Sequence, residues 1–219
     1  MRTKTLLLTA ALCAAGVATS LAQVYSVNAV GYVNLSLPAG YSLIANPLNN
    51  GSNHLKAVLT GVPDAAVVYQ WTGAAFDNDP PSYIDGVGWL NSVGPADDTV
   101  TLAPGAGFFL YLPAASTVTF VGEVPQGTLT QNVPTGYSIQ ASQVPQAGTL
   151  TALGFSAKDG DTVYQWIRSS QGYDANPPTF IEGGVGWIPQ EPTIGVGEGF
   201  FLYRTGTAGT WTRTFSVNN

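Results

Sequence analysis

The chain is poor in the residues that most often carry chemistry. Its 219 residues include one cysteine and one histidine, and only 9% are charged. Cys13 lies in an apolar N-terminal segment, so we expect the rest of the chain to have no disulfide, no thiol nucleophile and no cysteine-ligated metal. His54 lies beside Lys56 in a polar stretch, where we expect a solvated surface residue, and no nucleophile motif accompanies it.

Basic side chains are also scarce. Seven Lys and Arg stand against thirteen Asp and Glu, which gives a formal net charge of −6. Nucleic acids and anionic membrane surfaces bind proteins through Lys and Arg, so this balance argues against both partners. An acidic surface of this kind is typical of a secreted protein that must stay soluble.

Long hydrophobic runs are missing except at the N-terminus. Residues 1–22 have the pattern of a signal peptide: Arg2 and Lys4 precede an apolar stretch, and Ser20-Leu21-Ala22 predicts cleavage before Gln23. The stretch is shorter than the ~20 residues of a membrane span, although a retained N-terminal anchor is the lesser alternative. We therefore expect export to the periplasm, the cell surface or the medium, with no transmembrane span after the signal is removed.

What the chain does have is a tandem duplication. Five blocks recur in the same order at offsets of 92 to 98 residues, which predicts two homologous repeats, 23–125 and 126–219. The blocks of the first repeat are 40–42, 68–71, 80–84, 88–89 and 105–111, and those of the second are 136–138, 163–166, 177–181, 186–187 and 197–203.

Glycine and proline, 26 and 15 residues, separate short segments rich in Val, Tyr, Phe and Thr. This pattern predicts an all-β fold of two tandem homologous lobes, each resembling a β-sandwich or barrel. Residues 53–59 are the candidate for a short helix with Ser52 or Asn53 as N-cap, and 150–155 is a weaker counterpart, so we expect at most one short helix per lobe. The junction near Pro125-Gln126-Gly127 predicts a turn between strands and closely packed lobes, with shared strands as an alternative.

Two repeated strands are strongly apolar. Residues 108–111 and 200–203 read Phe-Phe-Leu-Tyr, which favours a central strand covered on both faces. The Gly-x-Gly before each one predicts a turn or bulge where another backbone approaches closely. Tyr69 and Trp71, repeated as Tyr164 and Trp166, share one face of a strand. Core packing explains them, and a sugar-stacking platform is the alternative.

The best candidate site is an acidic Pro-Pro loop present in both repeats. An acid and a second Asx residue precede the Pro pair, and an aromatic residue, another acid and a Trp follow it. The candidate residues are Asp77, Asp79, Tyr83, Asp85, Trp89, Asp174, Asn176, Phe180, Glu182 and Trp187. Asx side chains before Pro commonly close turns on their own backbone. The alternatives are oxygen ligation of Ca²⁺, the one cofactor considered, and carbohydrate contact through the four aromatic side chains.

No catalytic constellation is evident. A glycoside hydrolase needs two carboxylates in one cleft, and no motif pairs Glu123, Glu182, Glu191 or Glu198. We therefore expect a secreted non-enzymatic binding or structural protein of the cell envelope or extracellular space, with a glycan or an envelope protein as partner. A carbohydrate-binding module and a carboxylate-dependent glycoside hydrolase are the alternative functions.

The first repeat also resembles a known group. Residues 40–47, Gly-Tyr-Ser-Leu-Ile-Ala-Asn-Pro, followed by Pro-Gly-Ala-Gly-Phe-Phe at 104–109, resemble exported β-rich repeat proteins of the Planctomycetes–Verrucomicrobia bacteria, a group with no assigned function. In the second repeat, 140–143 read Gln-Ala-Ser-Gln where 44–47 read Ile-Ala-Asn-Pro, so the Asn-Pro turn occurs once. The resemblance implies export and a β-rich fold, and it implies no catalytic residue or ligand.

Overall fold

The computed structural model describes residues 29–217, and the predicted signal peptide lies outside them. Strands account for 49% of the structure and helix for 2%, which confirms the all-β class. None of the sheets in residues 29–217 closes on itself. The same part of the chain has no helix long and apolar enough to cross a membrane.

The first repeat forms one ribbon and one sheet. In the ribbon, β1 (Val30–Leu37) pairs antiparallel with β8 (Ser116–Glu123). The sheet has six strands in the order β2-β7-β3-β4-β5-β6. Their bounds are Gly40–Ala45, Gly107–Leu112, Val67–Tyr69, Ser82–Ile84, Gly88–Asn91 and Gly94–Pro95.

The second repeat follows the same order. Strands β10, β17, β12, β14 and β15 are neighbours in that order, as β2, β7, β3, β4 and β5 are, and β13 pairs antiparallel with the end of β12. The bounds of these six strands are Gly136–Ala141, Gly199–Arg204, Thr162–Ile167, Thr179–Ile181, Gly186–Ile188 and Gly172–Tyr173. The second ribbon pairs β9 (Gly127–Val133) with β18 (Gly209–Phe215), and β11 (Gly148–Thr149) pairs with β16 (Thr193–Ile194).

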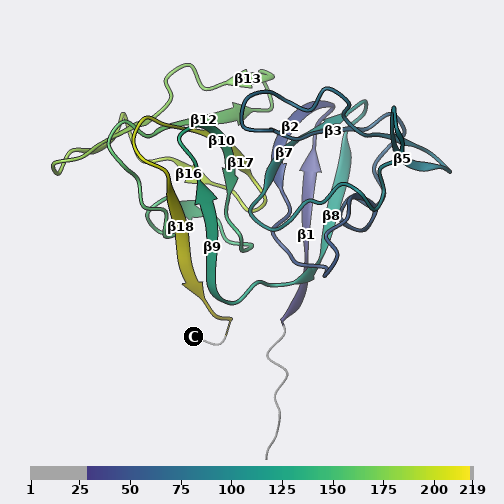
Figure 1. Cartoon of the computed structure of the whole chain (residues 1–219), viewed down its shortest axis with the longest axis horizontal. Helices are drawn as coiled ribbons and strands as arrows, with labels where there is room; N and C mark the ends of the chain where they lie inside the picture. The colour runs from purple at the N-terminus through teal and green to yellow at the C-terminus, as the bar shows by residue number, and fades with distance from the viewer. Residues whose placement is uncertain (1–28, 218–219) are drawn as a thin grey trace, which may run out of the picture.

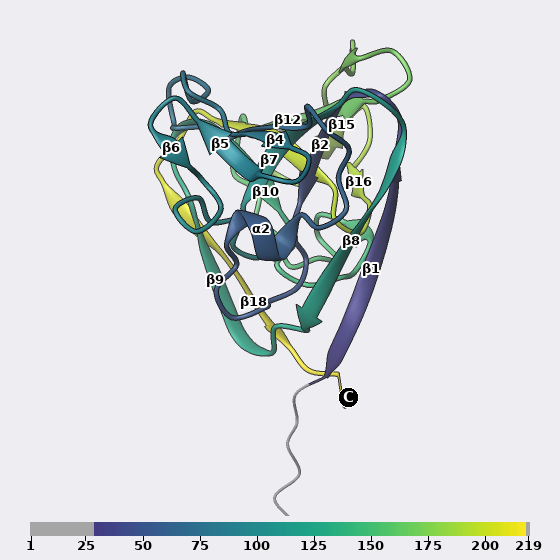
Figure 2. The same ribbon diagram turned by 90° about the vertical axis from the view of Figure 1, so that its right-hand side faces the viewer.

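The ribbons extend toward one end of the molecule. In Figure 1, β2, β7, β10, β17 and β12 lie in the upper half, and the β9–β18 ribbon runs below them, whereas the β1–β8 ribbon runs from the upper half to the lower end (Figures 1 and 2). The start of β1 and the end of β18 lie at the same lower end in both views (Figures 1 and 2). Residues 124–126 lead directly from β8 into β9, so the junction is a short connection between strands, as the sequence predicts.

The only helix within the described residues is α2 (Leu55–Val58), which lies inside the expected 53–59 segment. Its N-cap is His54, not Ser52 or Asn53. His54 is half-buried, which corrects the expectation of a solvated surface residue. In the second repeat, turns replace a helix around residues 150–154, where Gly154 has a φ of 77°.

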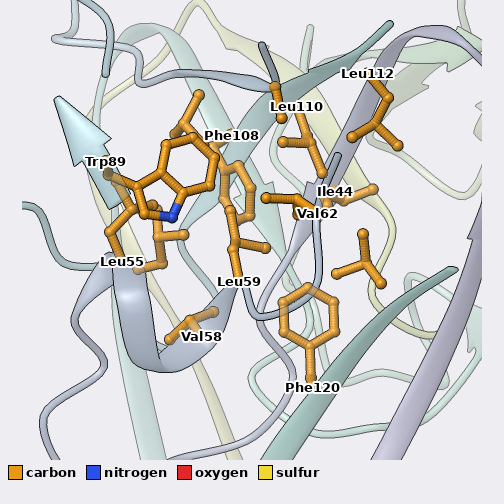
Figure 3. Packing of buried hydrophobic residues seen from close by; sticks show 14 of the residues in the cluster. Ile44, Leu55, Val58, Leu59, Val62, Trp89, Phe108, Leu110, Leu112 and Phe120 are labelled. Atoms are coloured by element: carbon orange, nitrogen blue, oxygen red, sulfur yellow. The ribbon is translucent and has the colours of Figure 1, made fainter. Parts of the chain in front are cut away.

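Each sheet covers its own core with its inner face. In the first repeat Phe108, Leu110 and Leu112 of β7 pack with Leu55 and Val58 of α2 (Figure 3). The second core consists of Val133, Leu150, Leu153, Phe155, Val163, Ile194, Phe200, Leu202 and Trp211, in which Phe200 and Leu202 match Phe108 and Leu110 of the first repeat. Fully burying one such side chain contributes about 1.5–3 kcal/mol, so each repeat has a substantial core of its own.

A third cluster combines both repeats. Leu43 and Phe109 of the first repeat pack with Phe201 of the second. Because side chains alternate along a strand, Phe108 and Phe109 face opposite ways. The strand is therefore covered on both faces, as its sequence predicts, and its second cover is the other repeat.

The Gly-x-Gly segments are the points where the repeats approach each other. A Cβ on Gly107 would lie 2.2 Å from Cγ2 of Ile139, and one on Gly199 would lie 3.2 Å from the carbonyl oxygen of Ile44. The amide of Ala45 donates to the carbonyl of Gly197 at 2.9 Å. The predicted close backbone approach is confirmed, and it explains why these positions are glycine.

Candidate functional site: an aromatic surface shared by the repeats

The outer faces of the two sheets are aromatic. On the first sheet, Tyr41 lies opposite Tyr111 in the pairing of β2 with β7, and Tyr69 of β3 lies opposite Phe109. The rings of Tyr41 and Tyr111 have centroids 5.1 Å apart, and those of Tyr41 and Tyr69 are 5.9 Å apart. Register and alternation together therefore collect one tyrosine from each of three neighbouring strands.

The second sheet repeats this arrangement. Tyr137 lies opposite Tyr203 with ring centroids 4.6 Å apart, and Tyr164 of β12 is 6.0 Å from Tyr137. The two tyrosine trios occupy matching positions in the duplicated sequence, so they follow from the same local pattern in both repeats.

Two tryptophans connect the trios reciprocally. Nε1 of Trp71 donates to the carbonyl of Tyr137 at 3.0 Å, and Nε1 of Trp166 donates to the carbonyl of Tyr41 at 2.9 Å. Trp166 also meets Phe109 edge to face, with centroids 4.9 Å apart. The Tyr-x-Trp strands are half-buried where the repeats meet, so they contribute both to packing and to an accessible surface.

Phe76 and Tyr173 lie between the two trios. Phe76 contacts Phe109 and Phe201 at centroid distances of 5.7 and 6.0 Å, and Tyr173 contacts the same two rings at 6.5 and 6.0 Å. Neither Phe76 nor Tyr173 is among the site residues that the sequence predicts. The available signal was their position, because each one stands directly before the acidic Pro-Pro loop of its repeat.

These rings line two open grooves, which share Phe76 and Tyr173. The larger groove has a volume of about 610 Å³, and the smaller one about 330 Å³. The larger groove is lined by Tyr41, Tyr69, Ala75, Phe76, Asp77, Asn78, Phe109, Trp166 and Tyr173. The smaller groove is lined by Trp71, Phe76, Tyr137, Tyr164, Tyr173 and Phe201.

Three tyrosines of this surface have raised pKa values. Burial raises the pKa of Tyr173 to about 12, although 40% of the residue is exposed. Burial, followed by hydrogen bonding to Tyr41, raises the pKa of Tyr69. The same two causes, with Tyr137 as the partner, raise the pKa of Tyr164. These three hydroxyl groups are therefore neutral near pH 7 and can both donate and accept hydrogen bonds.

The loops beside the two grooves differ between the repeats. In the second repeat, Gln171 holds the backbone of Tyr41: its Oε1 accepts from the Tyr41 amide at 2.6 Å, and its Nε2 donates to the Tyr41 carbonyl at 3.1 Å. The shorter loop of the first repeat closes on itself, with the Thr72 amide donating to the carbonyl of Ala75 at 2.9 Å. The backbone of Tyr41 is thus held by two side chains of the other repeat, Gln171 and Trp166.

The acids that precede the Pro pairs form turns. Oδ1 of Asp77 accepts from the amide of Asp79 at 2.9 Å, and Oδ1 of Asp174 accepts from the amide of Asn176 at 3.0 Å. The Asp79 carboxylate accepts from the amide and the hydroxyl of Ser92. The turn interpretation of this motif is therefore confirmed, and only Asp77 of these acids also lines a groove.

The acids that follow the Pro pairs lie elsewhere. The Asp85 amide donates to Oδ1 of Asp64 at 2.9 Å, and the Glu182 amide donates to Oδ1 of Asp159 at 3.0 Å. Both acids lie on exposed hairpins. Within residues 29–217 no three His, Cys, Asp or Glu side chains gather in a way that could hold a metal ion, so the structure adds no support for the Ca²⁺ hypothesis.

The aromatic residues of the Pro-Pro loops pack inward. Trp89 is only 1% exposed and lies in the first core with Tyr83, at a centroid distance of 5.4 Å (Figure 3). The burial of Trp89 in the first core argues against the prediction that its indole contacts a ligand. Phe180 and Trp187, the second pair, are half-buried and also lie 5.4 Å apart.

Three of the glutamates considered for hydrolysis accept hydrogen bonds from the chain. Glu198 accepts from the amide of Gly195 and from Gln165, and Glu191 accepts from the amide of Thr151. Glu182 accepts weakly from the amide of Asp159 at 3.4 Å. Among the described residues that line the two grooves, Asp77 is the only carboxylate.

Comparisons of this chain with protein-family models, with curated proteins and with solved structures found no match. The resemblance of the first repeat therefore stays a prediction, and no relative suggests a function. The function has to be inferred from the geometry of the grooves.

Proposed function

We propose that this is an exported, non-enzymatic binding protein of the cell envelope or extracellular space, and that its ligand binds in the two aromatic grooves. One observation carries the proposal: half-exposed rings from both repeats converge on an open surface, while each repeat already has a separate core. Exposed apolar patches lined by a few polar groups mark binding sites more often than scattered exposed side chains do.

The exposure of individual tyrosines supports this assignment. Tyr41, Tyr137 and Tyr173 are 39%, 45% and 40% exposed, and all three line a groove. A tyrosine ring carries a large apolar face and a polar tip, which suits it to contact a ligand that is also partly wet. The duplication provides a tyrosine trio in each repeat. The packing of the repeats against each other brings the two trios together into one binding surface.

The hydrolase alternative has less support. Two carboxylates would have to face each other across one cleft at about 5–9.5 Å, and the described groove walls offer only Asp77. A purely structural role in the envelope is the other alternative, in which the grooves would be covered by a permanent partner.

The chemistry of the grooves favours carbohydrate as the ligand class. The grooves are also a better-supported place for such a ligand than the aromatic residues of the Pro-Pro loops. Trp89 is buried, whereas Trp166 lines the larger groove together with Tyr41 and Tyr69. The sugar-stacking platform considered for the Tyr-x-Trp strands is thus the better-supported location for a carbohydrate site.

Binding by the grooves can be tested with one variant and one matched control. Tyr69→Ala removes a groove ring, and Tyr32→Ala removes an exposed tyrosine of β1 that lines neither groove. Immobilised glycans, peptides and lipids would be screened with both variants and the wild type. We expect at least one ligand to be lost with Tyr69→Ala and kept with Tyr32→Ala. Equal binding by all three proteins, or hydrolysis of a bound glycan, would contradict the proposal.

A further inference from the structure

The walls of the two grooves carry few charges. Asp77 is the only ionisable side chain among their described lining residues apart from tyrosines, and no Lys, Arg or His lines either one. The protein as a whole has a net charge of −6. An anionic ligand would gain no ion pair here and would be repelled by the overall charge. A cationic ligand would find one carboxylate, which is already accepting a hydrogen bond from the Asp79 amide.

The polar groups are unevenly distributed between the grooves. Asp77 and Asn78 lie together at one side of the larger groove, facing the same cavity as Tyr69 and Trp166. The smaller groove is lined by aromatic side chains alone. The larger groove therefore offers ring faces together with a carboxylate and an amide, whereas the smaller one offers ring faces and phenol hydroxyls.

A ligand that matches both grooves must have apolar faces as well as many hydroxyl groups. Sugar rings have C–H faces that suit aromatic rings, and hydroxyls around their edge that suit Asp, Asn and Tyr side chains. A fully apolar ligand would offer no hydrogen bond to Asn78 or to the second carboxylate oxygen of Asp77, and covering polar groups without giving them new partners costs free energy.

The grooves also form one surface. Phe76 and Tyr173 line both of them, so a ligand that passes these two rings reaches from one groove to the other. Resting on the function proposed above, we infer that the ligand is a neutral, linear oligosaccharide or polysaccharide. One sugar unit stacks in the larger groove, where Asp77 accepts hydrogen bonds from its hydroxyls and Asn78 both accepts and donates them. A further unit stacks on Tyr137 and Tyr164 in the smaller groove.

The test is a set of titrations followed by tryptophan fluorescence and by calorimetry. The probes are neutral hexasaccharides of glucose, mannose, galactose and xylose, their disaccharides, an oligogalacturonate as anionic sugar, and Nile red as an uncharged apolar probe. The proteins are the wild type, Tyr69→Ala, Asn78→Ala, Tyr137→Ala and Tyr32→Ala. Folding of every variant is verified by its urea midpoint.

We expect at least one neutral hexasaccharide to bind. Tyr69→Ala removes one stacking ring, so it should weaken binding by about tenfold. Asn78→Ala should weaken it by a smaller factor, and Tyr32→Ala should leave it unchanged. Tyr137→Ala should weaken binding of the hexasaccharide but not of the disaccharide, because only the longer ligand reaches the smaller groove.

The contrary outcomes separate the two proposals. If Nile red binds and is lost with Tyr69→Ala while no neutral sugar binds, the grooves bind a ligand but the saccharide inference is overturned. Preference for the oligogalacturonate overturns the inference of a neutral ligand. If no probe binds, or if binding is the same in Tyr69→Ala and wild type, both the saccharide inference and the groove function fail. Should Tyr69→Ala not fold, Asn78→Ala on its exposed loop and Trp166→Phe at the groove wall decide between the same outcomes.

Discussion

The indole of Trp71 donates its hydrogen bond to the main-chain carbonyl of Tyr137, in the other repeat, at 3.0 Å. The bond has a counterpart in the opposite direction, from Trp166 to Tyr41, at 2.9 Å. Tyr41 matches Tyr137 and Trp71 matches Trp166 in the duplicated sequence. The two repeats therefore contact each other as the subunits of a symmetric dimer do, with the same surface used on both sides.

This reciprocity predicts the effect of removing the two indole donors. Trp71→Phe should lower the free energy of unfolding by about 0.5–1.5 kcal/mol, because it removes the hydrogen bond to the Tyr137 carbonyl. Trp166→Phe should lower it by less, because Gln171 also donates to the Tyr41 carbonyl. Urea denaturation measures the loss. Trp211→Phe is the matched control within one repeat, where the same kind of bond runs to the carbonyl of Leu153. Only the first two variants should also alter ligand binding, and an effect of Trp211→Phe on binding would argue against a groove at the junction.

A buried ion pair in the second repeat replaces an apolar pair of the first. Arg204 makes two hydrogen bonds to Asp161, at 2.9 and 2.6 Å, and both side chains are fully buried. In the duplicated sequence, Leu112 and Ala66 occupy the same places and lie in the first core. Arg204→Leu alone should destabilise the protein by about 3–5 kcal/mol, because it leaves a buried carboxylate unpaired.

The double variant Asp161→Ala, Arg204→Leu copies the first repeat and serves as the control. Replacing a buried ion pair by apolar residues is often neutral or stabilising, so most of the loss should be recovered. The free energies of unfolding from urea titrations measure both effects. A double variant as unstable as Arg204→Leu alone would mean that the pair itself, and not the unpaired charge, determines stability at this position.

The close approach at the Gly-x-Gly segment predicts a position-specific intolerance to side chains. Gly107→Val should destabilise the protein by about 1–3 kcal/mol, the usual effect of overpacking, since even a Cβ would lie 2.2 Å from Cγ2 of Ile139. Adding Ile139→Ala should restore part of the stability by making room. Gly31→Ala on β1, where a Cβ would meet nothing within 4 Å, should have little effect. Equal thermal unfolding midpoints for Gly107→Val and Gly31→Ala would contradict the model of the junction.

The raised pKa of Tyr173 predicts a loss of stability in alkali. A tyrosine in the unfolded chain ionises near pH 10, whereas burial raises the pKa of Tyr173 in the folded protein to about 12. Between these values the unfolded state has released a proton that the folded state still holds. The free energy of unfolding should therefore fall as the pH rises from 10 to 12.

Urea titrations at pH 8, 10 and 11 measure this dependence. Tyr173→Phe should make it shallower, because the variant has no phenol at this position, and Phe76 at the matching place of the first repeat indicates that the junction accepts the ring alone. Some dependence should remain, since the pKa values of Tyr69 and Tyr164 are raised as well. An unchanged slope in Tyr173→Phe would refute the prediction.

Several features could be predicted from local sequence because they depend on local forces. The Asx turns at Asp77 and Asp174 follow from side chains that bond their own backbone. The apolar strand at 107–112 and the glycines before it follow from alternation and from the space that only glycine leaves. Trp89 shows the limit of this reasoning. A tryptophan in a short strand has a clear preference for a partly apolar site, but nothing in its neighbours says whether a core or a ligand covers it.

The sequence by itself therefore determined the all-β class, the duplicated pattern of strands and turns, and the two apolar Phe-Phe-Leu-Tyr strands. Only the tertiary structure decided that Trp89 is covered by a core, that Trp71 and Trp166 lie at a shared junction, and that Phe76 and Tyr173 join the two aromatic faces. The physical reason is that alternation assigns a residue to one side of a strand, whereas its exposure depends on what packs against that side, and here the packing partner is the other repeat.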